Sequence, residues 1–463
     1  MQRGAKSEAE RLKIKKQYDA VVADLAAMRD RIRGVYGYSS DPRQRLMGRM
    51  ASTAARFDVM TNLGGTVISS LPDLAVMQWR YGMASTFRHA WAPMLKSLTN
   101  PETRKALKSY RSQLQSLGIA AETYLNTRTN AFYDITDVYA PTSRFERAVN
   151  EASDKFGLVN VIGPWTDFTK WAAGMVSGNE ITRAVEAVAS GKAKARQIRD
   201  LAEGGVDGVM AERIWKQLSS ETGSDVIDGI RIPNTGSWAD GGAREAFEGM
   251  LARDVDIMVI TPGAEKPLMM SNPVMALILQ YKSFVAAANE RLLVRGLQAR
   301  DHRTLLALAS TLALGAVAEY AYSVVANRPT PKDNSDWVKA SVMRSGILGW
   351  YQEGNSIMEK WTGGAVDVFR LIGADMPDAR YISRSPGAAL MGPVYGKFET
   401  SVKAFSKLAA KAVGGDQEWT AGDTRQLRRL LPAQNLFYLR RLLDAGEAEV
   451  NELMGIEPLA PGK

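Results

Sequence analysis

The chain has 463 residues and a mass of 50.6 kDa, enough to bury a sizeable core or to form several domains. Its composition, 45% hydrophobic and 24% charged, is ordinary for a folded protein and excludes wholesale disorder. The chain has no Cys and only two His, which excludes disulfides, cysteine-based zinc and iron–sulfur sites, and cysteine nucleophiles. A net charge of +9 favours anionic partners, nucleic acid or lipid headgroups, without choosing between them.

The first 200 residues show helical periodicity almost throughout. Between Lys6 and Val35, apolar residues recur at alternating intervals of three and four, which predicts a helix with a coiled-coil-like seam. The seam consists of Tyr18, Val21, Leu25, Met28, Ile32 and Val35. Further helices are predicted over 41–62, 96–125 and 143–156, and a short one from Pro164.

The stretch Ser69-Ser70-Leu71-Pro72-Asp73 has the features of a helix start. The serines can cap the helix, Pro72 suits a first helical position, and Asp73 complements the positive end of the helix dipole. Gly82 is the residue at which we expect this helix to end.

Residues 201–271 are predicted to form an irregular, glycine-rich insertion between two helical regions. Val226–Pro233 is the best strand candidate of the chain, and it is short. We therefore expect an all-α fold, an elongated multi-helix bundle with coiled-coil-like terminal helices and at most a minor β element. The expected regions are an N-terminal helical region (1–200), the insertion (201–271) and a C-terminal helical region (272–463).

The C-terminal region is predicted to begin with an apolar helical hairpin at 272–326. Its first helix starts at Asn272-Pro273 and runs to about Arg300, and the apolar stretch 305–326 follows almost directly. Shorter helices, a basic amphipathic helix and a last helix with a leucine-rich seam are predicted at 337–396, 397–413 and 432–454.

The stretch 305–326 is long enough to cross a hydrocarbon core of about 30 Å, and arginines flank both of its ends. Glu319 opposes a lipid-facing span, because a carboxylate inside a lone helix costs about 2–3 kcal/mol. Three interpretations are open: a buried helix of a soluble bundle, insertion that depends on oligomerisation, and a constitutive single span. The candidate membrane-inserting residues are Leu305, Leu306, Leu308, Leu312, Leu314, Val317, Glu319, Tyr320, Tyr322, Val324 and Val325.

Basic clusters are candidates for contact with an anionic surface. The arginines around Leu430–Leu439 can contact phosphate, face water at helix ends, or pair with carboxylates of another subunit. The lysines that recur every fourth residue in 397–413 can lie on anionic lipid or form the solvated side of a bundle helix. These candidates are Lys403, Lys407, Lys411, Arg425, Arg428, Arg429, Arg440 and Arg441.

No catalytic motif is present in the sequence. It has no phosphate-binding GxxxxGK[ST] loop, no GxGxxG turn and no GxSxG elbow. His89 and His302 lack local partner motifs, and Glu221 is the one carboxylate we considered for glycan cleavage. Glycosidase chemistry needs a positioned pair of carboxylates, and no spacing here indicates one. We therefore expect no enzyme activity, no cofactor and no metal site.

Three separated stretches carry a resemblance to a known family. They are Phe57–Gly64 followed by Ser69–Ala75, then Pro273–Phe284 leading to Arg300-Asp301, then Arg429–Arg440. Together they resemble the helical C-terminal region of the large internal virion proteins, the DNA-ejection proteins, of short-tailed bacteriophages. Members of that family can carry an N-terminal lytic transglycosylase. No such domain is recognisable in this sequence, so that activity is not carried over.

The resemblance implies a protein of the virion interior, often stored around the portal. Such a protein leaves through the tail before or with the genome and helps to build a channel across the host cell envelope. The implied partners are sister copies in a homo-oligomer, other internal virion or portal proteins, host membrane lipid, and phage DNA bound non-specifically. The alternatives are a virion protein of the core or tail scaffold without membrane contact, and a basic virion protein that contacts DNA.

Overall fold

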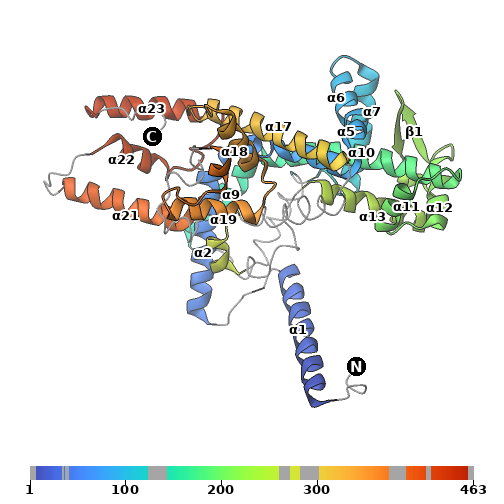
Figure 1. Cartoon of the computed structure of the whole chain (residues 1–463), viewed down its shortest axis with the longest axis horizontal. Coiled ribbons are helices and arrows are strands. Elements are labelled where there is room, and N and C mark those ends of the chain that lie inside the picture. The colour runs from blue at the N-terminus through green and yellow to red at the C-terminus, as the bar shows by residue number, and fades with distance from the viewer. Residues whose placement is uncertain are drawn as a thin grey trace.

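A computed structural model describes residues 7–33, 36, 41–121, 123, 143–259, 272–281, 302–374, 393–412 and 419–456. Within these residues the chain is helical apart from one two-stranded hairpin, which confirms the all-α prediction. The body is elongated, with α11, α12 and the hairpin at one end and α21, α22 and α23 at the other (Figure 1).

The N-terminal helix α1 (Glu8–Ile32) projects from this body (Figure 1). Its predicted seam is uncovered, since Tyr18, Val21, Leu25 and Met28 are 51–67% exposed. Helix α2 (Pro42–Asn62) begins as predicted, because the Asp41 side chain accepts a hydrogen bond from the Arg43 N–H and Pro42 occupies the first helical position.

A run of short helical turns follows α2. They are η2 (Leu63–Gly65), α3 (Thr66–Ser69), η3 (Leu71–Ala75), α4 (Val76–Tyr81), α5 (Met83–Thr86), the π-helical turn η4 (Phe87–Trp91) and α6 (Ala92–Lys96). Gly82 ends α4 with φ of 84°, as predicted, because this backbone conformation suits glycine. The predicted start at Ser69–Asp73 is a 3₁₀ turn instead of an α-helical one.

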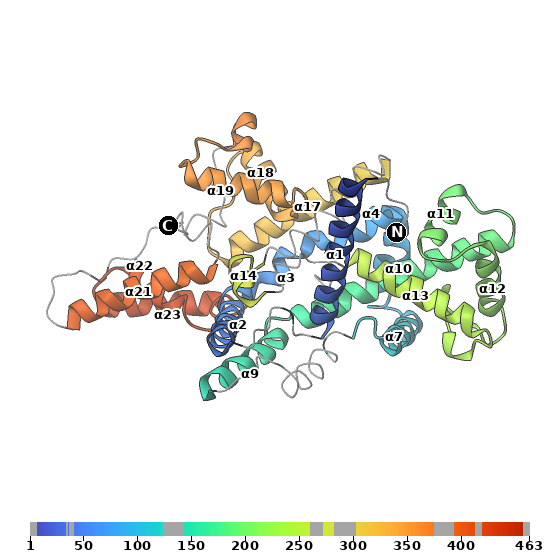
Figure 2. The ribbon, with the colours of Figure 1, turned by 90° about the horizontal axis from the view of Figure 1, so that it is seen from below.

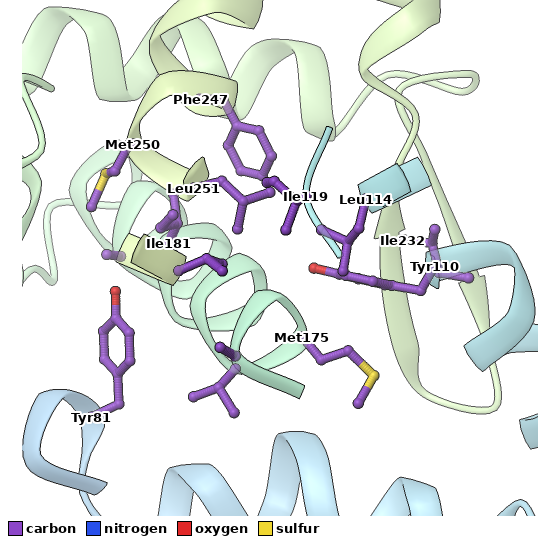
Figure 3. Close-up of a cluster of buried hydrophobic side chains, with 14 of the residues drawn as sticks. Tyr81, Tyr110, Leu114, Ile119, Met175, Ile181, Ile232, Phe247, Met250 and Leu251 are labelled. Atoms are coloured by element: carbon purple, nitrogen blue, oxygen red, sulfur yellow. The ribbon is translucent and has the colours of Figure 1, made fainter. Parts of the chain in front are cut away.

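The main hydrophobic core lies between 74 and 259. Helix α10 (Ile162–Ala189) runs through it, flanked by α7 (Pro101–Ser116), α11 (Ala195–Glu203), α12 (Gly208–Leu218) and α13 (Gly241–Met258). Tyr110, Leu114, Met175 and Phe247 converge there (Figure 3). The prediction of a short helix from Pro164 was wrong: α10 has 28 residues, and Gly174 lets Leu114 pack directly against its backbone.

The prediction that 201–271 is irregular was also wrong for its described part. Helices α12 and α13 are regular and contribute to the main core, and the glycines on which the prediction rested lie at helix ends or in turns. The strand predicted at Val226–Pro233 is a hairpin of β1 (Ser224–Ile227) and β2 (Ile230–Pro233). Asp228 and Gly229 form its two-residue turn with positive φ, which suits the twist of paired strands.

The C-terminal half contains α14 (Pro273–Ile278), α17 (His302–Val325), α18 (Asn334–Ser345), α19 (Trp350–Trp361), η8 (Val368–Ile372), α21 (Pro393–Ala412), α22 (Ala421–Arg428) and α23 (Arg440–Leu453). The predicted hairpin at 272–326 lies partly outside the described residues, at 282–301. In the N-terminal half, helix α9 (Arg144–Val159) precedes α10 and packs against α2.

The predicted helix over 432–454 begins only at Arg440, because residues 433–437 bind the end of α2. The Ala433 N–H donates to the Met60 carbonyl over 2.9 Å, and the Phe437 N–H donates to the Gly64 carbonyl over 3.3 Å. These contacts occupy backbone groups that a helix would otherwise use, so the chain remains in turns.

The C-terminal end of α2 also holds a buried ionic contact. Asp58, 1% exposed, accepts hydrogen bonds from Tyr281 Oη at 2.6 Å and Asn62 Nδ2 at 2.9 Å. Lys397 Nζ lies 2.9 Å from the same carboxylate, and burial lowers the pKa of this lysine. The three stretches that carry the family resemblance therefore meet at one junction, with α2 at its centre.

Candidate lipid- and anion-binding surface

The two halves of the protein bury different kinds of side chain. The largest fully buried side chains, among them Tyr110, Phe247 and Met175, all lie between Met77 and Met258. In the described residues from 302 to 456, the only large apolar side chains that are buried are Ile347 and Leu436. The other buried residues there are alanines, glycines, one proline, and polar or charged residues. The other larger apolar side chains in the described C-terminal half are therefore exposed or half-buried.

Helix α17 shows this inversion most clearly. Its covered face is small or polar, and consists of Ala307, Thr311, Gly315, Ala318, Glu319 and Ser323. Its outward face is large and apolar: Leu305 is 68% exposed, Leu306 50%, Val317 53%, Tyr320 57% and Val324 41%. The remaining predicted membrane residues are half-buried between these faces, and they are Leu308, Leu312, Leu314, Tyr322 and Val325.

Small residues let α17 approach its neighbours closely. It packs against α18 on one side and against η3 and α4 on another (Figure 2). A Cβ atom on Gly315 would overlap the carbonyl oxygen of Ser341 in α18, so only glycine fits at this crossing. On the η3–α4 side, Trp79 Nε1 donates to Thr311 Oγ1 over 3.0 Å. Contacts of this kind are typical of helices that pack inside membrane proteins.

Glu319 forms an ion pair within the chain. Its carboxylate is 6% exposed and accepts a hydrogen bond from the Arg344 guanidinium of α18, which also lies 4.1 Å from the centre of the Tyr322 ring. Pairing compensates much of the cost of burying this carboxylate. Glu319 therefore belongs to the covered face and not to the surface available for lipid.

Of the described helices, one is long and apolar enough to cross a membrane. Thr304–Val325 has 22 residues and a mean hydropathy of 1.5, and only 28% of its most apolar window is buried. A core helix of a soluble protein passes the same test of length and composition, but such a helix is mostly buried. The exposure of α17 distinguishes it from that case.

Arginines gather where α17 ends. The guanidiniums of Arg328, Arg344 and Arg440 lie 5.8, 4.1 and 6.0 Å from the centre of the Tyr322 ring. Arg429 is partly buried beside them, and burial together with neighbouring arginines lowers its pKa. The sequence identified Arg429 and Arg440, whereas it gave no signal that Arg344, on a separate helix, joins them.

Two other predicted arginines are neutralised by α23. Arg425 Nε lies 3.1 Å from Glu447, and Arg428 contacts both Glu447 and Asp444 at 2.7 and 2.6 Å. Arg441 Nη2 donates to the backbone carbonyl of Val324 at the end of α17, over 3.2 Å. These three arginines have partners inside the chain, whereas the partners considered from the sequence were phosphate, water at helix ends and carboxylates of another subunit.

The lysines of α21 do not form a free cationic row. Lys407 binds the Asp423 carboxylate of α22 at 2.8 Å, and Lys403 binds Glu399 one turn away at 2.7 Å. The side chain of Lys411 lies outside the described residues. The apolar face of α21 is uncovered, since Phe398, Val402 and Phe405 are 51–68% exposed.

The described residues contain no group of three His, Asp or Glu side chains that could hold a metal ion. Glu221 is exposed in the turn between α12 and β1, and His89 lies half-buried beside Glu180. Burial and nearby arginines lower the pKa of His89. The side chain of His302 lies outside the described residues.

Comparison with known proteins gives no relative: no family model, no curated protein and no solved structure matches this chain.

Proposed function

We propose that this chain is a non-enzymatic internal virion protein of a tailed bacteriophage. It is ejected with the genome and helps to form a channel across the host cell envelope, with the outward face of α17 as its lipid contact. The observation that carries this proposal is the inverted burial of the C-terminal half, where small and polar residues lie inside and large apolar residues lie outside.

The outward face of α17 gains free energy when lipid covers it. Complete burial of one Leu or Val side chain contributes about 1.5–3 kcal/mol. Because Leu305, Leu306 and Val317 are 50–68% exposed, covering these three alone contributes about 3 kcal/mol. The Glu319–Arg344 pair remains inside the protein in this docked state, so no unpaired charge enters lipid.

The composition of the chain suits passage through a narrow tail followed by refolding. No disulfide has to break, since the sequence contains no Cys. Helical elements depend mainly on local contacts and form fast. The uncovered apolar faces of α1 and α21 offer further surfaces for sister copies once the protein has been delivered.

Vesicle binding by a triple variant of the outward face tests this proposal. Leu305, Leu306 and Val317 are changed to Gln, which leaves the covered face of α17 intact. The loss of about 3 kcal/mol predicts vesicle binding weaker by about 10²-fold, together with loss of dye release, in sedimentation and leakage assays. A matched control changes Ile198, Val209 and Val226 to Gln, which are 54–70% exposed at the other end of the body.

Equal vesicle binding by the triple variant and the control would show that α17 is not the lipid contact. Absence of binding by the unmodified protein, at any pH, would remove the membrane part of the proposal. The scaffold alternative would then be favoured by the uncovered seam of α1, which predicts stable oligomers in solution without lipid affinity.

A further inference from the structure

The end of α17 carries more positive than negative charge. Six arginines gather there from four segments of the chain: Arg328, Arg344, Arg425, Arg428, Arg429 and Arg440. The carboxylates that pair with them in the described residues are Glu319, Asp444 and Glu447. Partly buried guanidiniums that face one another repel, and an anion between them would offset this repulsion.

Two members of this group have no carboxylate partner among the described residues. Arg328 follows α17 and lies 5.8 Å from the Tyr322 ring, while Arg429 caps the end of α22. Arg440 borders both, and among the described residues its carboxylate contact, to Asp444, is a long one of 4.0 Å. These three guanidiniums, which we call the arginine triad, can donate several hydrogen bonds to one tetrahedral anion.

The position of the arginine triad identifies the source of that anion. It lies at the end of a helix of membrane-spanning length, immediately after the exposed Val324. When the outward face of α17 contacts lipid, the end of the apolar stretch meets the headgroup layer. A DNA backbone would instead require a row of exposed cations, whereas these side chains are partly buried, and Arg328 and Arg440 both lie over the Tyr322 ring.

We propose that the arginine triad, Arg328, Arg429 and Arg440, binds the phosphate of an anionic phospholipid headgroup. This assignment rests on the proposed function, because α17 must contact lipid for a headgroup to reach the site. The protein then distinguishes anionic from zwitterionic membranes through one defined site, in addition to its general positive charge.

A double variant, Arg328→Gln with Arg429→Gln, tests the site in the full chain. Its control, Arg425→Gln with Arg213→Gln, removes the same charge from arginines paired with Glu447 and Asp240. Sedimentation compares vesicles of phosphatidylcholine with vesicles that contain phosphatidylglycerol. A cation near an anionic surface contributes about fivefold to binding, so the double variant is expected to lose about 30-fold on anionic vesicles only. The control is expected to lose less than about fivefold.

Thermal unfolding in solution tests the headgroup site at the arginine triad separately from the membrane contact of α17. Monomeric short-chain phosphatidylglycerol is expected to raise the melting temperature of the unmodified protein, and phosphatidylcholine of the same chain length is not. The double variant is expected to lose this response, and without ligand it is expected to melt no lower than the unmodified protein, because like-charge repulsion is relieved. If the protein does not bind vesicles but short-chain phosphatidylglycerol still raises its melting temperature, the proposed membrane contact is wrong and the headgroup site is retained.

Several results would overturn the assignment. An equal response to inorganic phosphate would make the site one for a free anion. A loss of DNA retention without a loss of vesicle binding would make it a nucleic-acid contact. A marked drop in melting temperature of the ligand-free double variant and of Arg429→Lys would show that these arginines serve the fold alone.

Discussion

Replacing Gly315 with Ala tests how closely α17 and α18 approach each other. The added Cβ would overlap the Ser341 carbonyl oxygen and lie 3.2 Å from its carbon and 3.3 Å from the Ser345 nitrogen. All three atoms belong to the backbone of α18, so no side-chain rotation relieves the overlap and the helices must separate. Overpacking of this kind costs about 1–3 kcal/mol, against a gain of up to about 1 kcal/mol from higher helix propensity.

The expected net loss of about 1.5 kcal/mol appears where the two helices meet. Amide hydrogen exchange of peptides from α17 and α18 should become about tenfold faster, while peptides from α10 and α13 keep their rates. Gly354→Ala in α19 is the matched control, because nothing lies within 4 Å of its added Cβ. That variant should exchange no faster than the unmodified protein. Unchanged exchange in α17 and α18 of the Gly315 variant would refute the close crossing.

Two further predictions concern other contacts of the C-terminal half. In Gly64→Ala the added Cβ would overlap the backbone at Asn435 and Leu436, so the junction should open at a cost of about 2–3 kcal/mol, measured as faster exchange in 430–439. Burial raises the pKa of Asp73 to about 7, so the folded state retains a proton that the unfolded state releases as the pH rises from about 4 to 7. The protonated carboxyl therefore stabilises the folded state at low pH, and this stability is lost as the pH rises toward 7. In urea unfolding, the free energy of unfolding of Asp73→Asn should rise relative to that of the unmodified protein by about 1–2.5 kcal/mol between pH 5 and pH 8. A constant difference between the two proteins across this pH range would contradict the raised pKa of Asp73.

The sequence predicted which segments are helical better than it predicted where helices end. The sequence located α2 within 41–62, and the Asp41 cap and Pro42 that fix its start are local features of the sequence. The glycines of 201–245 misled the prediction, since Gly204 ends α11 and Gly241 begins α13, so they lie at the ends of regular helices. The start of α23 was missed because its cause, backbone hydrogen bonds to Met60 and Gly64, comes from residues about 370 positions away.

The candidate surface was predictable in its residues but not in its orientation. Length and hydropathy identified 305–326, but its hydrophobic residues surround the whole helix, so periodicity could not say which face is covered. The elements that pack on the covered face are α18 and η3. The ion-pair partner of Glu319 is Arg344, which lies 25 residues further along the chain. No local pattern encodes such a pair.

The two halves differ in what stabilises them, and this difference agrees with a protein that changes its surroundings. The main core between 74 and 259 excludes water from large apolar side chains, which favours folding in water without a partner. The C-terminal half instead buries charges such as Lys339, which pairs with Glu359 and Asp367. Buried ion pairs seldom add net stability, because desolvation offsets their attraction, but they do specify which groups must meet. Such a half keeps its arrangement while its outward apolar residues remain available, which is what the proposed lipid contact requires.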